Sequence, residues 1–435
     1  MKQKIHPNKQ WFIDSRFGMF IHFGLYSSIG RGEWVRSSEL MTIEAYQPYF
    51  DSFNPRAFDA EQWAKAASEA GMKYIILTAK HHDGFCLYDS KYTDYKITNT
   101  PFGRDLVAEY LEAARKYNLK VGLYFSLIDW YHPDFPKYAD RHHPMRGNEA
   151  YRDEDIDWEN YLTFMHNQVE ELVTQYGELD IMWFDFSYDD MSGEKWDAEK
   201  LMNMVSQHQP NIVIDNRLET SGEGFGSIVD AEPTSYAGDY ISPEHIIPPY
   251  PIKDVNGNLV PWELCTSINN SWGYDPTDCS YKSAKFIIRK LVECISKNGN
   301  ILLNIPPDGT GKFNTQSLEV LSEIGDWMSL NGDAIYENGP AIGLEKPEWG
   351  YYTQKDDQTI YAHIFDGPLG VLPLPGLASS QITSVKRVMD NSVVKISDSW
   401  TALAFPDTTF VELHNNHATE ALADDIDMVL EIKLK

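Results

Sequence analysis

One carboxylate in this chain stands near the end of a short apolar run, a position typical of catalytic groups. Asp185 is the seventh residue of the run 179–186, whose other members are mostly apolar. A run of this length predicts a buried strand, and a carboxylate at its carboxyl end emerges at the rim where barrel enzymes form their active sites. Side chains alternate along a strand, so Asp185 shares a face with Trp183. This partly dry setting favours a nucleophile or an acid/base group, although a helix N-cap or a surface ion-pair partner is the simpler alternative.

Two further carboxylates are candidates for a partner of Asp185. Glycoside cleavage uses two carboxyl groups that flank the scissile bond. Glu244 follows Gly238 on a long connection rich in proline and glycine, and such loops often carry active-site residues. Glu263 stands at the beginning of a predicted strand, at the end away from the rim. The sequence therefore favours Glu244 as the second catalytic carboxyl, with Glu263 as the alternative.

Other predicted strands also end in polar residues. His22 interrupts an apolar run, and Lys80 is followed by the adjacent pair His81 and His82. Adjacent residues of an extended chain point to opposite sides, so this pair is a poor metal chelate and suits the recognition of hydroxyl groups better. The same rim is expected to hold Glu33 and Trp34 from the loop after the first strand, Tyr124 from the third strand, and Asp215, Asn216 and Arg217 at the end of the fifth.

Two other functional classes compete with a glycosidase. A barrel metallohydrolase would use His81, His82 and Asp185 as ligands, and the adjacency of the two histidines argues against it. A carbohydrate-binding protein without activity would use the 12 Trp and 25 Tyr residues for stacking on sugar rings. The presence of both Asp185 and Glu244 argues against a site that has lost its chemistry.

The elements that position these residues alternate between strand and helix. Apolar runs predict strands at 17–24, 74–79, 121–126, 181–186, 212–216, 263–268 and 300–305, with amphipathic helices at 59–70, 106–114 and 158–176 between them. The first of these helices begins at Asp59, with Gln62 three residues later, and ends before Gly71. Such alternation predicts parallel strands with crossover helices, and its repetition favours a closed (β/α) barrel over residues 1–340.

The pattern changes after Pro340. Short alternating runs at 358–365, 409–413 and 428–434 are separated by turn residues and accompanied by little helix. This pattern predicts a separate antiparallel β-sandwich over residues 341–435.

Composition limits the partners of the protein. The 435 residues include 65 acidic and 37 basic side chains, a formal net charge of -28. A surface this negative repels nucleic acids and anionic membranes, and no apolar stretch is long enough to span a bilayer. The N-terminal residues lack the apolar core of a signal peptide, and the four cysteines are widely spaced. We therefore expect a cytoplasmic protein with free thiols, and a homo-oligomer is compatible with these features.

These motifs, in this order, resemble the α-L-fucosidases of glycoside hydrolase family 29. The likeness extends from about residue 11 to residue 336 and is carried by FGMFIHFG at 17–24, KHHDGF at 80–85, WFD at 183–185, NR at 216–217, SWGY at 271–274 and GNILLNI at 299–305. It implies a retaining exo-enzyme that removes terminal α-L-fucosyl residues from oligosaccharides or glycoconjugates. It also implies that neither a metal nor an organic cofactor takes part.

The resemblance further implies a role for each candidate residue. It makes Asp185 the nucleophile and Glu244 the acid/base, since the family carries this glutamate on a variable loop after the fifth strand. The positions that correspond to fucose-binding residues are His22, Glu33, Trp34, His81, His82, Tyr124, Trp183, Arg217 and Trp272.

Overall fold

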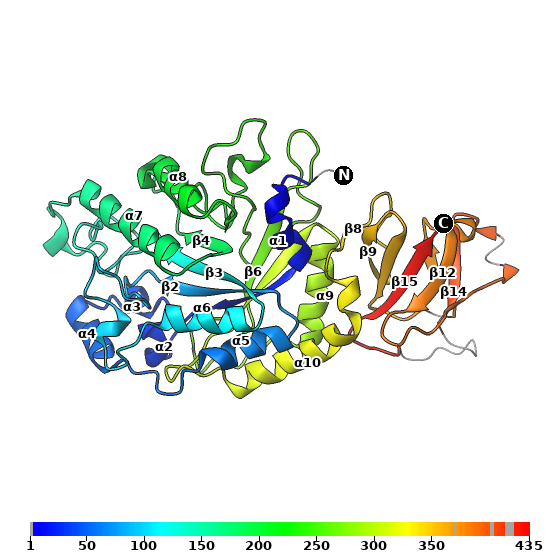
Figure 1. Ribbon diagram of the computed structural model, residues 1–435, viewed down its shortest axis with the longest axis horizontal. Coiled ribbons are helices and arrows are strands. Elements are labelled where there is room, and N and C mark those ends of the chain that lie inside the picture. The colour runs from blue at the N-terminus through cyan, green and yellow to red at the C-terminus, as the bar shows by residue number, and fades with distance from the viewer. Residues whose placement is uncertain (1–2, 369, 401–403, 414–421) are drawn as a thin grey trace.

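A parallel sheet comes first in the chain, and two antiparallel sheets follow it (Figure 1). The computed structural model describes residues 3–368, 370–400, 404–413 and 422–435. The strands of the parallel sheet are β1 (Phe17–Ile21), β2 (Tyr74–Lys80), β3 (Lys120–Ser126), β4 (Ile181–Asp185), β5 (Val213–Ile214), β6 (Trp262–Ser267) and β7 (Gly299–Asn304). All seven predicted strands are therefore confirmed, with shifts of a few residues at their ends.

Helices connect these strands and carry the predicted caps. The α-helices are α1 (Gln10–Ser15), α2 (Leu25–Ile29), α3 (Val35–Ser38), α4 (Ile43–Ser52), α5 (Ala60–Glu69), α6 (Leu106–Lys116), α7 (Trp158–Gln175), α8 (Ala198–His208), α9 (Ala284–Ile295) and α10 (Thr315–Asn331). Short 3₁₀ helices are η1 (Pro7–Lys9), η2 (Ile97–Asn99), η3 (Glu149–Tyr151), η4 (Gly193–Trp196), η5 (Gly226–Val229), η6 (Gly332–Ala334) and η7 (Ser379–Gln381). Asp59 caps α5 by accepting the Gln62 amide at 3.3 Å, and Gly71 ends it with a φ of 81°.

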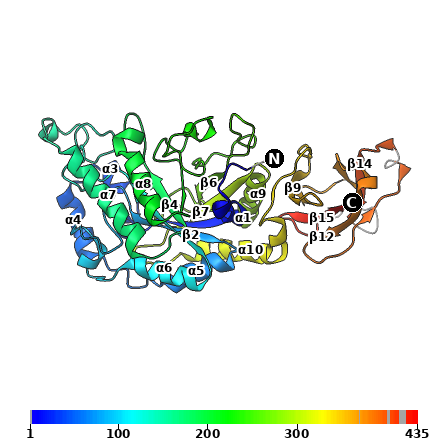
Figure 2. The same cartoon turned by 45° about the horizontal axis from the view of Figure 1, so that its top comes forward.

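The parallel sheet has the strand order β5-β4-β3-β2-β1-β7-β6. Helices α5, α6 and α10 lie along one side of it in both views (Figures 1 and 2). Because all strands run in one direction, their carboxyl ends meet at one edge, where the polar residues of the sequence are gathered. Parallel strands with crossover helices are thus confirmed.

A short segment lies between the two outer strands of this sheet. Residues 240–244 form isolated parallel bridges with Asp215 beyond β5 on one side, and with Trp262 and Cys265 of β6 on the other. The last residue of the segment is Glu244, which bridges Cys265. The loop that carries this carboxylate is therefore tied to the sheet through the backbone.

The C-terminal strands form two antiparallel sheets that share one apolar cluster. The five-stranded sheet has the order β12-β15-β10-β9-β8 and the three-stranded sheet the order β11-β14-β13. The bounds are β8 (Gly339–Pro340), β9 (Gly350–Asp356), β10 (Thr359–Ile364), β11 (Leu372–Pro375), β12 (Ile382–Arg387), β13 (Lys395–Ile396), β14 (Thr408–Glu412) and β15 (Met428–Leu434). Leu430 and Ile360 of the larger sheet pack in the same cluster as Leu374 and Val411 of the smaller one. The predicted strands at 358–365, 409–413 and 428–434 are confirmed.

Helices α9 and α10 connect these sheets to the rest of the protein. The Arg289 guanidinium of α9 donates to the backbone carbonyls of Phe365 and Ile426, at 2.7 Å each. The Trp327 indole of α10 donates to the carbonyl of Asp427 at 3.2 Å. Within the described ranges, no helix has the length and apolar character needed to cross a membrane.

Candidate active site

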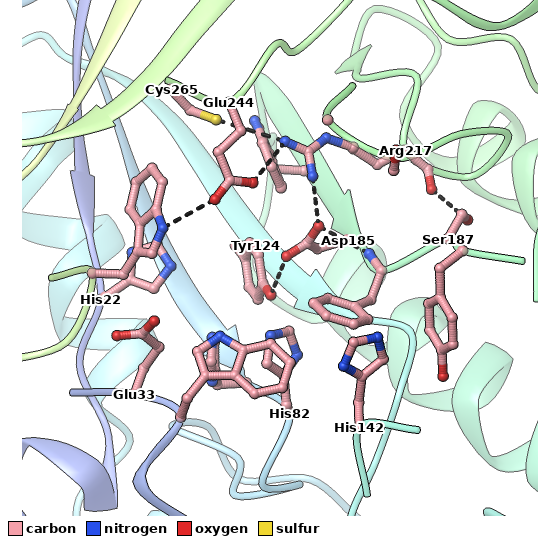
Figure 3. A pocket seen from close by; sticks show the side chains of 18 of the residues that line it. His22, Glu33, His82, Tyr124, His142, Asp185, Ser187, Arg217, Glu244 and Cys265 are labelled. Atoms are coloured by element: carbon pink, nitrogen blue, oxygen red, sulfur yellow. Dashed lines mark hydrogen bonds and ion pairs between the residues drawn. The ribbon is translucent and has the colours of Figure 1, made fainter. Parts of the chain in front are cut away.

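A pocket of about 520 Å³ opens at the carboxyl edge of the parallel sheet (Figure 3). The residues that the sequence assigned as catalytic or sugar-binding all line it: His22, Glu33, Trp34, His81, His82, Tyr124, Trp183, Asp185, Arg217, Glu244 and Trp272. They come from five strand ends and from the loops that follow β1, β5 and β6. Glu263, the alternative to Glu244, lies elsewhere. Asp215 and Asn216, which the sequence placed at the same rim, are completely buried and do not line the pocket.

Asp185 is held by three donors at the end of β4. Its Oδ2 accepts the Tyr124 hydroxyl at 2.8 Å, and its Oδ1 accepts Arg217 Nη1 at 3.0 Å and the amide of Phe186 at 2.9 Å. Burial raises the pKa of Asp185 to about 6, against the opposing effect of Arg217, and the negative charge of Glu244 contributes to the rise. The carboxylate is therefore fixed in orientation while its charge is only partly compensated, which suits a nucleophile.

Arg217 connects Asp185 to Glu244. Its Nη2 lies 3.4 Å from Glu244 Oε2, while the second Glu244 oxygen accepts the Trp272 indole N–H at 3.1 Å (Figure 3). The Glu244 side chain is 40% exposed, compared with 15% for Asp185. One carboxyl group is thus largely enclosed and the other is more open to solvent and to a leaving group.

Asn216 joins the loop after β5 to the segment that carries Glu244. Its Oδ1 accepts the backbone amide of Ser242 at 3.1 Å, and its Nδ2 donates to the carbonyls of Gly224 and Phe225. Ser242 in turn accepts Arg217 Nε at 2.8 Å through its hydroxyl. The polar cluster at the end of the fifth strand therefore positions both Arg217 and the loop of Glu244.

The histidines line one wall of the pocket as neutral rings. Burial lowers the pKa of His22 to about 3, and it lowers the pKa values of His81 and His82 well below the ordinary range. Asn304 lies 2.8 Å from His22 Nδ1, and the Ser126 hydroxyl lies 2.8 Å from His82 Nδ1. A neutral imidazole ring offers one donor and one acceptor for hydrogen bonds without adding charge to the pocket.

The expected orientation of His81 and His82 was wrong. Both rings line the pocket, and their centroids are 3.9 Å apart. The strand ends at Lys80, so the extended conformation on which that expectation rested does not continue through the pair. Among the described residues, no group of three His, Cys, Asp or Glu side chains is arranged as a metal site.

Glu33 and Trp272 also line the pocket. Glu33 Oε2 accepts the amide of Gly273 at 2.7 Å, which fixes the loop that presents Trp272. Burial raises the pKa of Glu33, while the Gly273 amide opposes the rise. The ring centroids of Trp272 and His22 are 5.1 Å apart, so Trp272 packs against the histidine that follows β1.

Trp183 forms the floor beneath Asp185. Its ring stacks on Tyr124 with centroids 5.6 Å apart and planes inclined by 23°, and the Arg217 guanidinium carbon lies 4.8 Å from its centroid. The ring centroids of Trp34 and His82 are 5.0 Å apart. Aromatic faces next to donor nitrogens are typical of sugar pockets, where C–H faces and hydroxyl groups are bound together.

Sequence comparison identifies the family. A family model described as Alpha-L-fucosidase matches residues 1–333. The chain belongs to the α-L-fucosidase family. Its curated relatives include the human tissue α-L-fucosidase, which is 28% identical over 411 residues that cover 87% of this chain and 80% of the relative.

Solved structures of α-L-fucosidases have the same architecture. Isoenzyme 1 from Paenibacillus thiaminolyticus is 50% identical, with a TM-score of 0.94 and 99% of each chain covered. A family 29 enzyme from Bacteroides thetaiotaomicron, solved as a trapped covalent intermediate with 2-fluoro-fucosyl fluoride, is 28% identical, with a TM-score of 0.82 and coverage of 100% and 98%. The covalent intermediate of that relative is consistent with a retaining mechanism in this fucosidase family.

Several pocket residues escaped the sequence analysis of this α-L-fucosidase family member. They are Phe20, Arg141, His142, Phe186, Ser187, Tyr188, Ser221, Gly222, Glu223, His245 and Cys265. Phe186, Ser187 and Tyr188 directly follow Asp185, so the rule that sites form after strand ends could have found them. Arg141 and His142 lie in a long irregular connection between β3 and α7, where no periodic signal marks them.

Proposed function

We propose that this chain is a retaining exo-α-L-fucosidase in which Asp185 is the nucleophile and Glu244 the general acid/base. The observation that carries the assignment is the Arg217 guanidinium, which donates to both carboxyl groups at the rim of one pocket. A largely enclosed, firmly held carboxylate beside a more open one corresponds to the two roles that a retaining mechanism needs. We expect the two carboxyl groups to act about 5–5.5 Å apart in the substrate complex.

The first step forms a glycosyl ester. Asp185 attacks the anomeric carbon while Glu244 gives its proton to the departing glycosidic oxygen, so the bond breaks without releasing a free alkoxide. Arg217 loses its ion pair with Asp185 as that carboxylate becomes a neutral ester, while the negative charge now lies on Glu244, to which Arg217 also donates. The α-fucoside becomes a β-linked ester at this stage.

The second step returns the enzyme to its starting state. Glu244, now ionised, removes a proton from water, which attacks the anomeric carbon from the side that the leaving group occupied. The ester bond breaks, and Asp185 regains its charge. Two inversions give net retention, and no metal or cofactor enters either step.

The remaining pocket residues are proposed to bind the sugar. The neutral rings of His22, His81 and His82, with Glu33 and Arg217, present donors and acceptors for the hydroxyl groups of fucose. Trp34, Tyr124, Trp183 and Trp272 present apolar surface for its C–H face and its C5 methyl group. The substrate is accordingly a fucosylated oligosaccharide or glycoconjugate.

We further propose a closed barrel, a C-terminal β-sandwich and a cytoplasmic location for this enzyme. The bridges of segment 240–244 with both outer strands support a barrel that closes through this segment, within a catalytic domain of residues 1–340. The apolar cluster shared by the two antiparallel sheets supports a β-sandwich over residues 341–435. We propose a cytoplasmic enzyme because the chain has free thiols, three of them buried.

A panel of substrates tests the function. The purified protein is assayed with an aryl α-L-fucoside and with α-1,2-, α-1,3-, α-1,4- and α-1,6-linked fucosyl oligosaccharides, with and without a chelator. We expect release of fucose with net retention, measured by NMR at early times, and no effect of the chelator. Release of the inverted anomer, or no release from any fucoside, would contradict the proposal.

A further inference from the structure

A carboxyl group lies beneath the pocket floor and has no part in the chemistry proposed above. Glu263, the second residue of β6, is completely buried. Its Oε2 accepts a short hydrogen bond from the hydroxyl of Tyr74 on β2, and that hydroxyl also lies 3.5 Å from Asn300 Nδ2 on β7. One oxygen of the carboxyl group is therefore bonded to Tyr74, whose hydroxyl is in turn contacted by Asn300.

The other side of this carboxyl group faces the floor of the active site. Glu263 Oε1, the hydroxyl of Tyr240 and the indole N–H of Trp183 are all buried, and none has a formed hydrogen bond. Tyr240 and Trp183 nevertheless lie close enough to stabilise the ionised carboxyl and to oppose the rise in the pKa of Glu263. A buried polar atom without a partner is costly, so three such atoms that converge on one point are natural partners for one another.

Trp183 connects this cluster to the nucleophile. The Arg217 guanidinium lies over its ring, and the Tyr124 ring stacks on it. These two residues donate the side-chain hydrogen bonds that orient Asp185. A shift of the indole would therefore move both donors.

We propose that Glu263 is a positioning residue for the reaction, which holds the Trp183 indole from beneath and thereby keeps Arg217 and Tyr124 in place around Asp185. This inference rests on the role proposed for Asp185. Glu263 does not touch the substrate, because its carboxyl group is sealed below the floor. Its effect is on the geometry of the ester-forming step.

The charge state of the cluster fits this role. Burial raises the pKa of Glu263 to about 8, so the group is mostly the neutral acid below that pH. The ionisable groups that interact with it are Tyr74 on β2, Tyr240 of segment 240–244 and Cys265 on β6; Asp215 beyond β5 interacts with Tyr240, and Arg16 beyond α1 with Tyr74. Burial raises the pKa values of the first four and lowers that of Arg16 to about 10. A neutral acid offers one donor and one acceptor, and the side chain of glutamine offers the same pair.

Two substitutions distinguish a positioning role of the Glu263 carboxyl group from a role in which its side chain only fills space in the core. Glu263→Leu removes both polar atoms, whereas Glu263→Gln keeps a donor and an acceptor in nearly the same volume. With an aryl fucoside in rapid-mixing experiments, we expect Glu263→Leu to lower the rate constant for ester formation by about 10–100-fold per active site, since small displacements of reacting groups have effects of this size. Glu263→Gln should stay within about threefold of wild type.

A matched control is available on α7. Glu171 is also a buried carboxyl, bonded to the Ser90 hydroxyl and the Lys91 amide at 2.8 Å each, and it does not line the pocket. Glu171→Leu should lower the melting temperature without changing the rate per active site, which burst titration counts. A wild-type rate per active site in Glu263→Leu would overturn the inference.

Tyr74→Phe provides a second test if Glu263→Leu fails to fold. It removes the short hydrogen bond to Glu263 and keeps the ring, so we expect about a threefold to tenfold loss in ester formation. Tyr110→Phe, which removes a buried hydroxyl bonded only to backbone carbonyls, is its control. An unchanged rate in Tyr74→Phe would overturn the inference alone, whereas a wild-type protein that cleaves no fucoside would overturn the proposed function and this inference with it.

Discussion

Asp185 and Glu244 accept hydrogen bonds from the two terminal nitrogens of a single guanidinium, that of Arg217, at 3.0 and 3.4 Å. One carboxylate comes from a strand end and the other from a loop, so this shared cation determines their relative position. Burial opposes the charge of Arg217, but the two carboxylates raise its pKa above the ordinary value. The guanidinium is therefore permanently charged in the resting site.

Arg217→Lys should be strongly impaired although the charge is kept. A lysine ammonium cannot reach both carboxyl groups with the fixed geometry of a guanidinium. We expect kcat/KM for an aryl fucoside to fall about 10²–10³-fold, the range seen when a preorganised donor is lost. Arg31→Lys, at an exposed ion pair with Glu39, is the control. A variant within tenfold of wild type would show that Arg217 does not organise the site.

Asp185→Gly should lower turnover by several orders of magnitude, because no covalent ester can form. Azide should partly restore cleavage of an activated aryl fucoside by entering the space of the lost carboxylate. The product should be the β-fucosyl azide, inverted at the anomeric carbon, since azide attacks from the face that Asp185 occupied. NMR of the product checks the configuration, and an α-azide would refute the assignment.

The activity should fall as the pH decreases through about 6. Burial raises the pKa of Asp185 to about 6, and the nucleophile must be ionised to attack, so its protonation removes activity on the acid side. The dependence of kcat/KM on pH reports this group in the free enzyme. An acid limb near pH 4, the ordinary range of an aspartic acid, would mean that burial does not control the nucleophile.

Much of this site follows from the sequence because the strand ends determine it. Asp185 and Tyr124 lie on predicted strands, and the period-two alternation was enough to point both into one pocket. The contact between Arg217 and Glu244 could not be predicted from strand patterns, because it depends on the bridges that segment 240–244 makes with the sheet. The resemblance to the family supplied their roles, whereas the pattern of apolar residues did not.

The wrong prediction for His81 and His82, and the pocket residues that were not predicted, also have physical causes. His81 and His82 were assigned to opposite sides because the strand was assumed to continue, while the chain turns after Lys80. Arg141 and His142 come from an irregular loop, whose path depends on tertiary contacts such as the bond between Ser37 and the carbonyl of His142. The burial of Glu263 was consistent with its place at the start of β6, but its link to Trp183 could not be read from spacing.

The proton on Glu263 should make stability depend on pH. The unfolded chain releases this proton near pH 4.5, whereas the folded protein keeps it until about pH 8. The folded state therefore binds more protons between these values, so this group's contribution to stability decreases as the pH rises through that window. The melting temperature of Glu263→Gln, relative to wild type, should increase from pH 5 to pH 8. A difference that is independent of pH would show that Glu263 ionises normally.

The dependence of the rate on the leaving group decides whether Glu244 or Glu263 is the acid/base. A general acid matters most when the leaving group is poor, because protonation then makes bond breaking possible. Glu244→Ala should therefore lose about 10²–10⁴-fold in ester formation with a natural disaccharide and far less with an activated aryl fucoside. Azide should rescue turnover with retained configuration, since the ester on Asp185 still forms and azide then attacks the opposite face.

Glu263→Ala is the informative comparison for that experiment. Its carboxyl lies below the floor and cannot reach the glycosidic oxygen, so its loss should slow both substrates by the same factor and azide should not rescue it. The ratio of the two rate constants for ester formation, aryl fucoside over disaccharide, is the quantity to measure for each variant. If that ratio rises in Glu263→Ala and stays at the wild-type value in Glu244→Ala, the acid/base belongs to Glu263.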